Sequence, residues 1–129
     1  VLDPDNGILN SFTNALNHCQ NIYPYSDVFI SPVTSSFAVD SINDCMRNEV
    51  SQRIFHCSGD SMVSYYSLAQ SLFKMDSSIL SGSPLPNEIN YKPIMPQLSS
   101  DSEVSYVQKL EDVIVELGSV IHSKLDILC

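Results

Sequence analysis

Histidine and cysteine stand side by side at two places in the sequence, where they could bind a metal ion. The two pairs are His18-Cys19 and His56-Cys57. Zinc accepts two histidines and two cysteines, but the two ligands of a pair usually stand about two to five residues apart. Adjacent side chains on a helix point about 100° apart, so neither pair can easily grip one ion. We therefore expect no metal ion and no cofactor.

Four cysteines could form disulfides or act as small buried apolar residues. They are Cys19, Cys45, Cys57 and Cys129. An even number of cysteines in a short chain is typical of a disulfide framework. Free cysteines are among the most buried residues, and Cys19 and Cys45 fall on the apolar faces of predicted helices. The sequence leaves both interpretations open.

Serine, histidine and aspartate all occur, but no motif frames a catalytic nucleophile. The sequence has no Gly-x-Ser-x-Gly elbow and no Gly-rich phosphate-binding loop. The acidic pairs Asp3/Asp5 and Asp101/Glu103 stand near the starts of predicted segments, where they stabilise the helix dipole. Neither pair follows the calcium-binding loop pattern with its central glycine. We therefore predict that the chain is not an enzyme.

Length and charge restrict the possible architecture and partners. A chain of 129 residues forms at most one domain, so residues 1–129 are a single domain or part of one. The 43% hydrophobic content is too high for a disordered tail. With a net charge of −9, the surface repels nucleic acid and anionic membranes, and we expect a protein partner or self-association. No apolar run approaches the ~20 residues needed to cross a bilayer.

Apolar spacing predicts two helices joined by a short strand in the first part of the chain. Residues 7–22 form the first helix, and Tyr23-Pro24 ends it. Residues 28–30 are a short β-prone run. Ser31 can then cap a second helix, because its hydroxyl accepts a hydrogen bond from an otherwise unbonded backbone N–H. Pro32 suits the first helical position, where its missing N–H is not needed.

The middle of the chain has a less regular pattern. Residues 49–57 could form a short helix, and residues 63–75 fit either a helix or a strand. Residues 81–96 contain four prolines, so we predict a loop there with at most one helical turn.

The last segment has the clearest pattern, which predicts a helix over residues 102–126. Eight apolar residues recur at three- and four-residue spacing: Val104, Val107, Leu110, Ile114, Leu117, Ile121, Leu125 and Leu128. We expect the four in the middle of this stripe to face protein: Leu110, Ile114, Leu117 and Ile121. Asp112 and Glu116 lie off the stripe and are expected to face solvent.

Motifs in the order of a known family resemble the N-terminal part of a serpin. The stretch "VFISP" resembles the family's strand 6B leading into helix B, and Ala38, Gln52 and Ile54 follow it at the family's spacings. Upstream, "FTNALNHC" resembles helix A. Downstream, "YYSLAQSLFKMD" resembles strand 2A, and residues 90–128 resemble the end of helix E, strand 1A and helix F. The resemblance covers nearly the whole chain but leaves no room for helix D.

The resemblance implies a predominantly α fold with a few short strands, a serpin-like N-terminal α+β segment. It implies a parent class of protease inhibitors, but a segment that is non-inhibitory alone. The reactive-centre loop and most of sheet A, into which a cleaved loop inserts, lie beyond Cys129 in the family. Ser31 and Thr34 match hydroxyls of the family's shutter region; the simpler interpretation is an N-cap and a helix-interior threonine.

The resemblance also favours an extracellular location, with an intracellular one as the alternative. Because the chain starts at Val1 rather than methionine, we expect a processed product or a fragment.

An all-α helical bundle closed by disulfides is the alternative fold. It would act as a small secreted binding module or structural assembly module. The stretches "ILNSFTNAL" and "YVQKLEDVIVELGSV" resemble the first and last helices of the terminal assembly domains of spider silk proteins. Four free thiols would favour the serpin-like interpretation, and two disulfides would favour the bundle.

Overall fold

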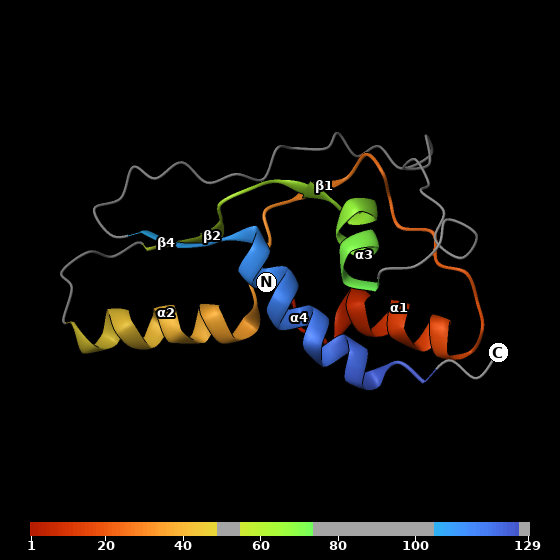
Figure 1. Ribbon diagram of the computed structural model, residues 1–129. Coiled ribbons are helices and arrows are strands. Elements are labelled where there is room, and N and C mark those ends of the chain that lie inside the picture. The colour runs from red at the N-terminus through yellow and green to blue at the C-terminus, as the bar shows by residue number, and fades with distance from the viewer. Residues whose placement is uncertain (49–54, 74–104, 127–129) are drawn as a thin grey trace.

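The computed structural model describes residues 1–48, 55–73 and 105–126 of the chain, and these form a helix-rich fold with short strands (Figure 1). The helices are α1 (Gly7–Asn17), α2 (Ser35–Arg47), α3 (Tyr65–Phe73) and α4 (Leu110–Lys124). The strands are β1 (Phe29–Ile30), β2 (His56–Gly59), β3 (Val63–Ser64) and β4 (Ser105–Gln108). The prediction of a mainly helical fold with a few short strands is confirmed, and the all-α alternative is wrong.

The strands form two separate sheets of two strands each. Strands β1 and β3 pair antiparallel, with Phe29 opposite Ser64 and Ile30 opposite Val63. Strands β2 and β4 pair in parallel, with Cys57 opposite Tyr106. The second sheet joins distant parts of the chain and lies beside α2, whereas α1, α3 and α4 lie together on the other side of the molecule (Figure 1).

Helices α1, α3 and α4 supply most of the hydrophobic core. Its buried members are Leu2, Leu9, Leu16, Ile22, Leu68, Ala69, Leu72, Phe73, Val113, Leu117 and Ile121. Phe12 of α1 and Phe73 of α3 meet edge to face, with ring centroids 6.2 Å apart and planes at 74°, a favourable arrangement for aromatic rings. No residue of α2 belongs to this set, although α2 carries several apolar side chains.

Helix α1 ends five residues earlier than predicted, because the chain turns at Cys19. This residue has a φ of 58°, in the left-handed region. The Gln20 N–H donates to the carbonyl of Ala15, and the Cys19 N–H donates to that of Leu16. This pair of bonds is the Schellman arrangement that closes a helix, with cysteine in the position that glycine usually holds.

Helix α2 begins at Ser35, so the predicted start at Pro32 with Ser31 as its cap is wrong. Thr34 is the N-cap, and its hydroxyl oxygen accepts a hydrogen bond from the Phe37 N–H at 3.2 Å. The N-terminal segment explains the delay: the Leu2 N–H donates to the Val33 carbonyl, and the Ser35 N–H donates to the Leu2 carbonyl. This bridge holds the chain extended up to Thr34.

Two predictions for the middle of the chain are corrected. His56 and Cys57 lie in strand β2 rather than at the end of a helix, while residues 49–54 lie outside the described residues. The ambiguous stretch from Val63 is a strand of two residues followed by helix α3. The strand 2A that the resemblance implies there is therefore wrong. The predicted loop at 81–96 lies outside the described residues.

The last predicted helix is divided into strand β4 and helix α4. Residues 105–108 pair with β2 instead of continuing the helix, and Val107 is 51% exposed. Burial of Leu117 and Ile121 is confirmed, whereas Leu110 and Ile114 are only half-buried. Val104 and Leu128 lie outside the described residues. Within the described ranges, no helix is long and apolar enough to cross a bilayer.

Candidate functional site

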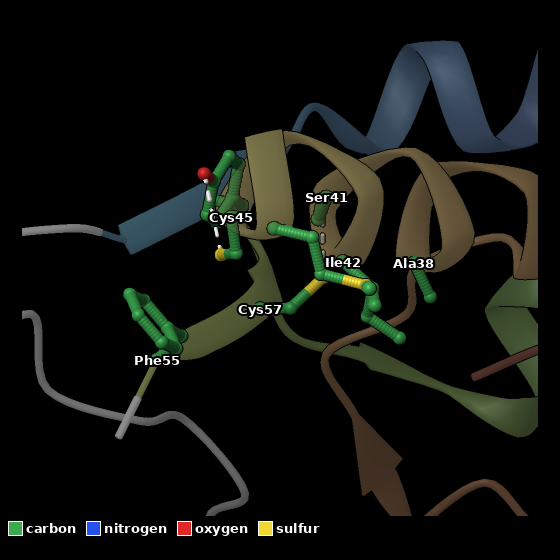
Figure 2. Close-up of a pocket in the computed structure, with 8 residues that line it drawn as sticks. Ala38, Ser41, Ile42, Cys45, Phe55 and Cys57 are labelled. Atoms are coloured by element: carbon green, nitrogen blue, oxygen red, sulfur yellow. Dashed lines mark hydrogen bonds between the residues drawn. The ribbon is translucent and has the colours of Figure 1, made fainter. Parts of the chain in front are cut away.

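An open apolar cavity of about 330 Å³ lies between α2 and the β2–β4 sheet (Figure 2). Helix α2 provides one wall with Ala38, Ser41, Ile42, Cys45 and Met46. Cys57 of β2, the preceding Phe55, and Tyr106 of β4 provide the other wall. Figure 2 shows the labelled side chains of the two walls around the same space.

Local structure explains why these residues meet. The α2 residues recur at three- and four-residue spacing, so they share one face of the helix. On the sheet, Cys57 and Tyr106 are neighbours in the parallel register. The Tyr106 hydroxyl contacts α2 at Cys45. The Cys57 thiol also contacts α2, because it lies 3.8 Å from the Ser41 hydroxyl.

Tyr106 forms the polar end of the cavity. Its hydroxyl donates a hydrogen bond to the Asp44 carboxylate at 2.6 Å and accepts one from the Cys45 thiol at 3.4 Å. The bond to Asp44, and then the bond to Cys45, raises the pKa of the Tyr106 phenol far above its usual value. The phenol therefore stays protonated, and its hydrogen is committed to Asp44.

Two of the four cysteines lie in this cavity as free thiols. Cys45 and Cys57 are both half-buried and unbridged. Cys19 lies elsewhere, at the exposed end of α1, and is disulfide-bonded. Cys129 also lies outside these ranges.

A strip of exposed apolar side chains runs along α2 at the mouth of the cavity. This α2 strip consists of Val39, Ile42 and Met46, which are 54%, 59% and 74% exposed. Their spacing of three and four residues places them along one line of the helix surface. Ile42 and Met46 also line the cavity, so the strip and the cavity form one continuous apolar surface.

A second group of polar residues fixes the start of α2 to β4 and α4. The Thr34 N–H donates to the Gln108 side-chain oxygen at 2.8 Å, and the Thr34 hydroxyl donates to the Glu116 carboxylate at 2.9 Å. Ser36 also donates to Glu116. A carboxylate at this end of a helix is favourable for the helix dipole. The prediction that Glu116 faces only solvent is therefore wrong.

The two shutter-like residues serve different contacts. Ser31 donates its hydroxyl hydrogen to the Gly59 carbonyl at 2.9 Å, so it connects the segment that follows β1 to β2. Thr34 caps α2 and is buried, and it is not the helix-interior residue of the simpler interpretation. Both contacts are joints between elements, and neither residue lines the cavity.

Part of this site can be predicted from the sequence. Their chemistry makes Cys45 and Cys57 candidates, whereas no motif points to Tyr106 or Met46. Tyr106 lies within the predicted last helix, so its position on a strand beside α2 could not be predicted. The available signal was the width of the apolar surface on α2, which carries Val39 and Met46 outside the face expected to pack inward.

The described residues provide apolar surface and hydrogen bonds at the cavity, which is chemistry for binding. They contain no group of three histidine, cysteine or acidic side chains placed to hold a metal ion. A second cavity, between α3 and α4, has hydroxyls that bond within their own helices, at Ser71 and Ser119. Comparison with protein-family models, curated proteins and solved structures finds no match to this chain.

Proposed function

We propose that this chain is a non-catalytic binding module that holds an apolar, basic segment of a partner protein along the α2 strip. The observation that carries the proposal is the continuity of the exposed strip with the open cavity. Single exposed apolar residues are normal on a protein surface, but a contiguous apolar patch marks an interaction site. The repeat of Val39, Ile42 and Met46 suits a helical segment packed along α2.

Charge favours a basic partner over a second copy of the chain. The protein carries a net charge of −9, and α2 itself carries Asp40 and Asp44. A partner with lysine or arginine next to its apolar residues would be attracted to this surface. A second copy would bring an equal negative charge to the same place.

A model peptide tests the proposal directly. The probe is a labelled amphipathic helical peptide of leucine and lysine, with a leucine–glutamate peptide of the same pattern as its charge control. We expect the lysine peptide to raise fluorescence anisotropy at micromolar protein, and the glutamate peptide to bind at least about tenfold more weakly. Binding should weaken as salt is raised, because salt screens exposed charges.

Two variants locate the binding surface. Met46→Asp places a charge in the strip and should weaken peptide binding at least about tenfold. Val115→Asp is the matched control, because Val115 is 71% exposed but lies on α4. Equal binding by the two variants would overturn the assignment to α2. A dimer in light scattering that Met46→Asp dissociates would instead identify a second copy as the occupant.

As a second candidate, we propose that the chain is a serpin-like segment that does not inhibit proteases alone. The order of α1, β1 and α2 supports it, because helix A, strand 6B and helix B are implied there. Helix α3 and strand β2 depart from the family pattern. The disulfide at Cys19 supports an extracellular location, but a bridge beside the free thiols of Cys45 and Cys57 meets neither of the thiol patterns expected for the two folds.

A panel of serine proteases tests this second candidate. The purified chain is incubated with trypsin-like, chymotrypsin-like and elastase-like enzymes and then run on denaturing gels. We expect cleavage or no change, because the family's inhibition needs a loop that inserts into a larger sheet. A covalent complex that survives denaturant would contradict the expectation.

A further inference from the structure

The cavity beside the α2 strip is rich in sulfur. Cys45, Met46 and Cys57 are three of its eight lining residues, and Phe55 lies near them. Sulfur is polarizable and makes favourable contacts with the edges of aromatic rings. We propose that the cavity takes a tryptophan side chain of the partner as the anchor of binding, an inference that rests on the proposed function above.

The size of the cavity suits a single large side chain. Its volume of about 330 Å³ is at the lower end of the range for ligand pockets, which is about 300–1,000 Å³. It opens beside Ile42 and Met46 of the strip, so a helix lying on the strip could turn one residue into it. Interface anchors are most often tryptophan, tyrosine or arginine in such pockets.

The hydrogen-bond state of Tyr106 selects tryptophan over phenylalanine. Because the hydroxyl hydrogen is bonded to Asp44, the Tyr106 oxygen can only accept a hydrogen bond from a ligand. It accepts from the Cys45 thiol, and a hydroxyl oxygen has two lone pairs. The indole N–H is a donor and nothing else, so it matches the remaining lone pair. Phenylalanine would leave this second lone pair unused, with Cys45 as the donor to the first.

Charge at the same end of the cavity acts against acidic ligands. The Asp44 carboxylate lies 2.6 Å from the Tyr106 hydroxyl. A ligand carboxylate near this position would meet a like charge, whereas a neutral indole would not. An aromatic side chain with a lysine neighbour therefore suits both the apolar cavity and the net negative charge of the protein.

Two probe peptides separate the anchor from the strip. Both have the leucine–lysine pattern, and they differ only in a central tryptophan or alanine. The protein contains no tryptophan, so the peptide indole is the only one in the mixture. We expect the tryptophan peptide to bind about tenfold more tightly, with a blue shift of its emission as the indole leaves water. Equal affinities would overturn the anchor but leave the proposed function intact.

Two variants and a chemical measurement locate the indole. Ala38→Phe places a ring in the cavity and should reduce the affinity of the tryptophan peptide to that of the alanine peptide on the natural chain. Tyr106→Phe removes the acceptor, so it should weaken the tryptophan peptide about threefold or more and a phenylalanine peptide less. Without any variant, the tryptophan peptide should slow alkylation of Cys45 and Cys57 by iodoacetamide. Alkylation at the unslowed rate would contradict the placement.

Failure of the two proposals can be told apart. If neither peptide binds, the proposed function is overturned. N-acetyltryptophanamide then tests the cavity alone, by its effect on alkylation of Cys45 and Cys57. Slower alkylation would support the aromatic site without the peptide, and an unchanged rate would overturn it.

Discussion

Apolar side chains are buried in one region of this molecule and largely exposed in another. In the core region, made of α1, α3 and α4, apolar side chains pack against one another and are buried, as at Leu72 and Ile121. In the α2 region, made of α2, β2 and β4, Ser41 is the one buried residue of the helix. Most apolar side chains of α2 instead surround an open cavity or face solvent, as at Ala38, Ile42 and Met46.

The difference teaches how a helix can be held in place without burying its apolar face. Polar bonds fix the start of α2, through Thr34, Gln108 and Glu116. The bond from Tyr106 to Asp44 fixes it further along. Because these contacts position the helix, its apolar surface is available to a partner. We therefore expect stability to depend on the core region and binding to depend on the α2 region.

The sharpest contrast is between Leu72 and Ile42. Leu72→Ala empties a fully buried site in the core region and should lower the free energy of unfolding by about 2–5 kcal/mol. Ile42→Ala removes a side chain that is 59% exposed and should change it by about 0.5 kcal/mol or less. Urea denaturation of both variants measures the difference. Similar losses would show that the two regions are equally packed.

Two glycines provide the next contrast. A Cβ at Gly59 would lie 2.4 Å from the Pro32 carbonyl oxygen, so Gly59→Ala should cost about 1–3 kcal/mol by overpacking the joint to the α2 region. A Cβ at Gly118, within α4, would meet nothing within 4 Å. Gly118→Ala should therefore stabilise the protein by up to about 1 kcal/mol, since alanine favours a helix. Thermal melts of the Gly59→Ala and Gly118→Ala variants check the direction of both changes. A lower melting temperature for Gly118→Ala would contradict the open space around that position.

The caps of α1 and α2 should differ in their importance. Thr34 accepts the Phe37 N–H, whereas Asn6 forms no side-chain cap bond to α1. Thr34→Ala should cost about 1–2 kcal/mol, and Thr34→Ser should restore most of it because serine keeps the hydroxyl. Asn6→Ala should cost less than Thr34→Ala. Equal losses at the two caps in urea denaturation would argue against the polar joint at α2.

The smallest expected effect is a pH dependence at Tyr106. The folded state raises the pKa of this phenol above its usual value of 10.0. As pH rises past that value, the unfolded chain loses the phenol proton while the folded chain keeps it, so stability falls. Tyr106→Phe lacks this contribution and should lose less stability between about pH 9 and about pH 11.5. Parallel slopes of melting temperature against pH for the two proteins would refute the Asp44 contact.

Elements set by local pattern could be predicted from the sequence. The apolar spacing of residues 7–17 gave α1, and the β-prone run before Ser31 gave β1. The same spacing identified Leu117 and Ile121 as buried. In each case the information lies within a few residues of the position concerned.

Features set by distant pairing could not be predicted in the same way. Helix α2 starts late because Leu2 pairs with the chain before it. Residues 105–108 have a helical spacing, yet they become a strand because β2 supplies a backbone partner. Since Tyr106 stands on that strand, the cavity depends on the same pairing. The spacing of apolar residues within a segment carries no information about these distant pairing partners.

The parallel pairing of β2 with β4 also sets the order in which the molecule can assemble. His56 pairs with Ser105, roughly fifty residues later, and such distant contacts form slowly. During synthesis, α2 emerges long before the residue that closes its cavity, Tyr106. We expect the nascent chain to present the bare face of α2 until β4 docks. Competence to bind at the cavity would then arrive at the end of folding, when β4 adds the second wall with Tyr106.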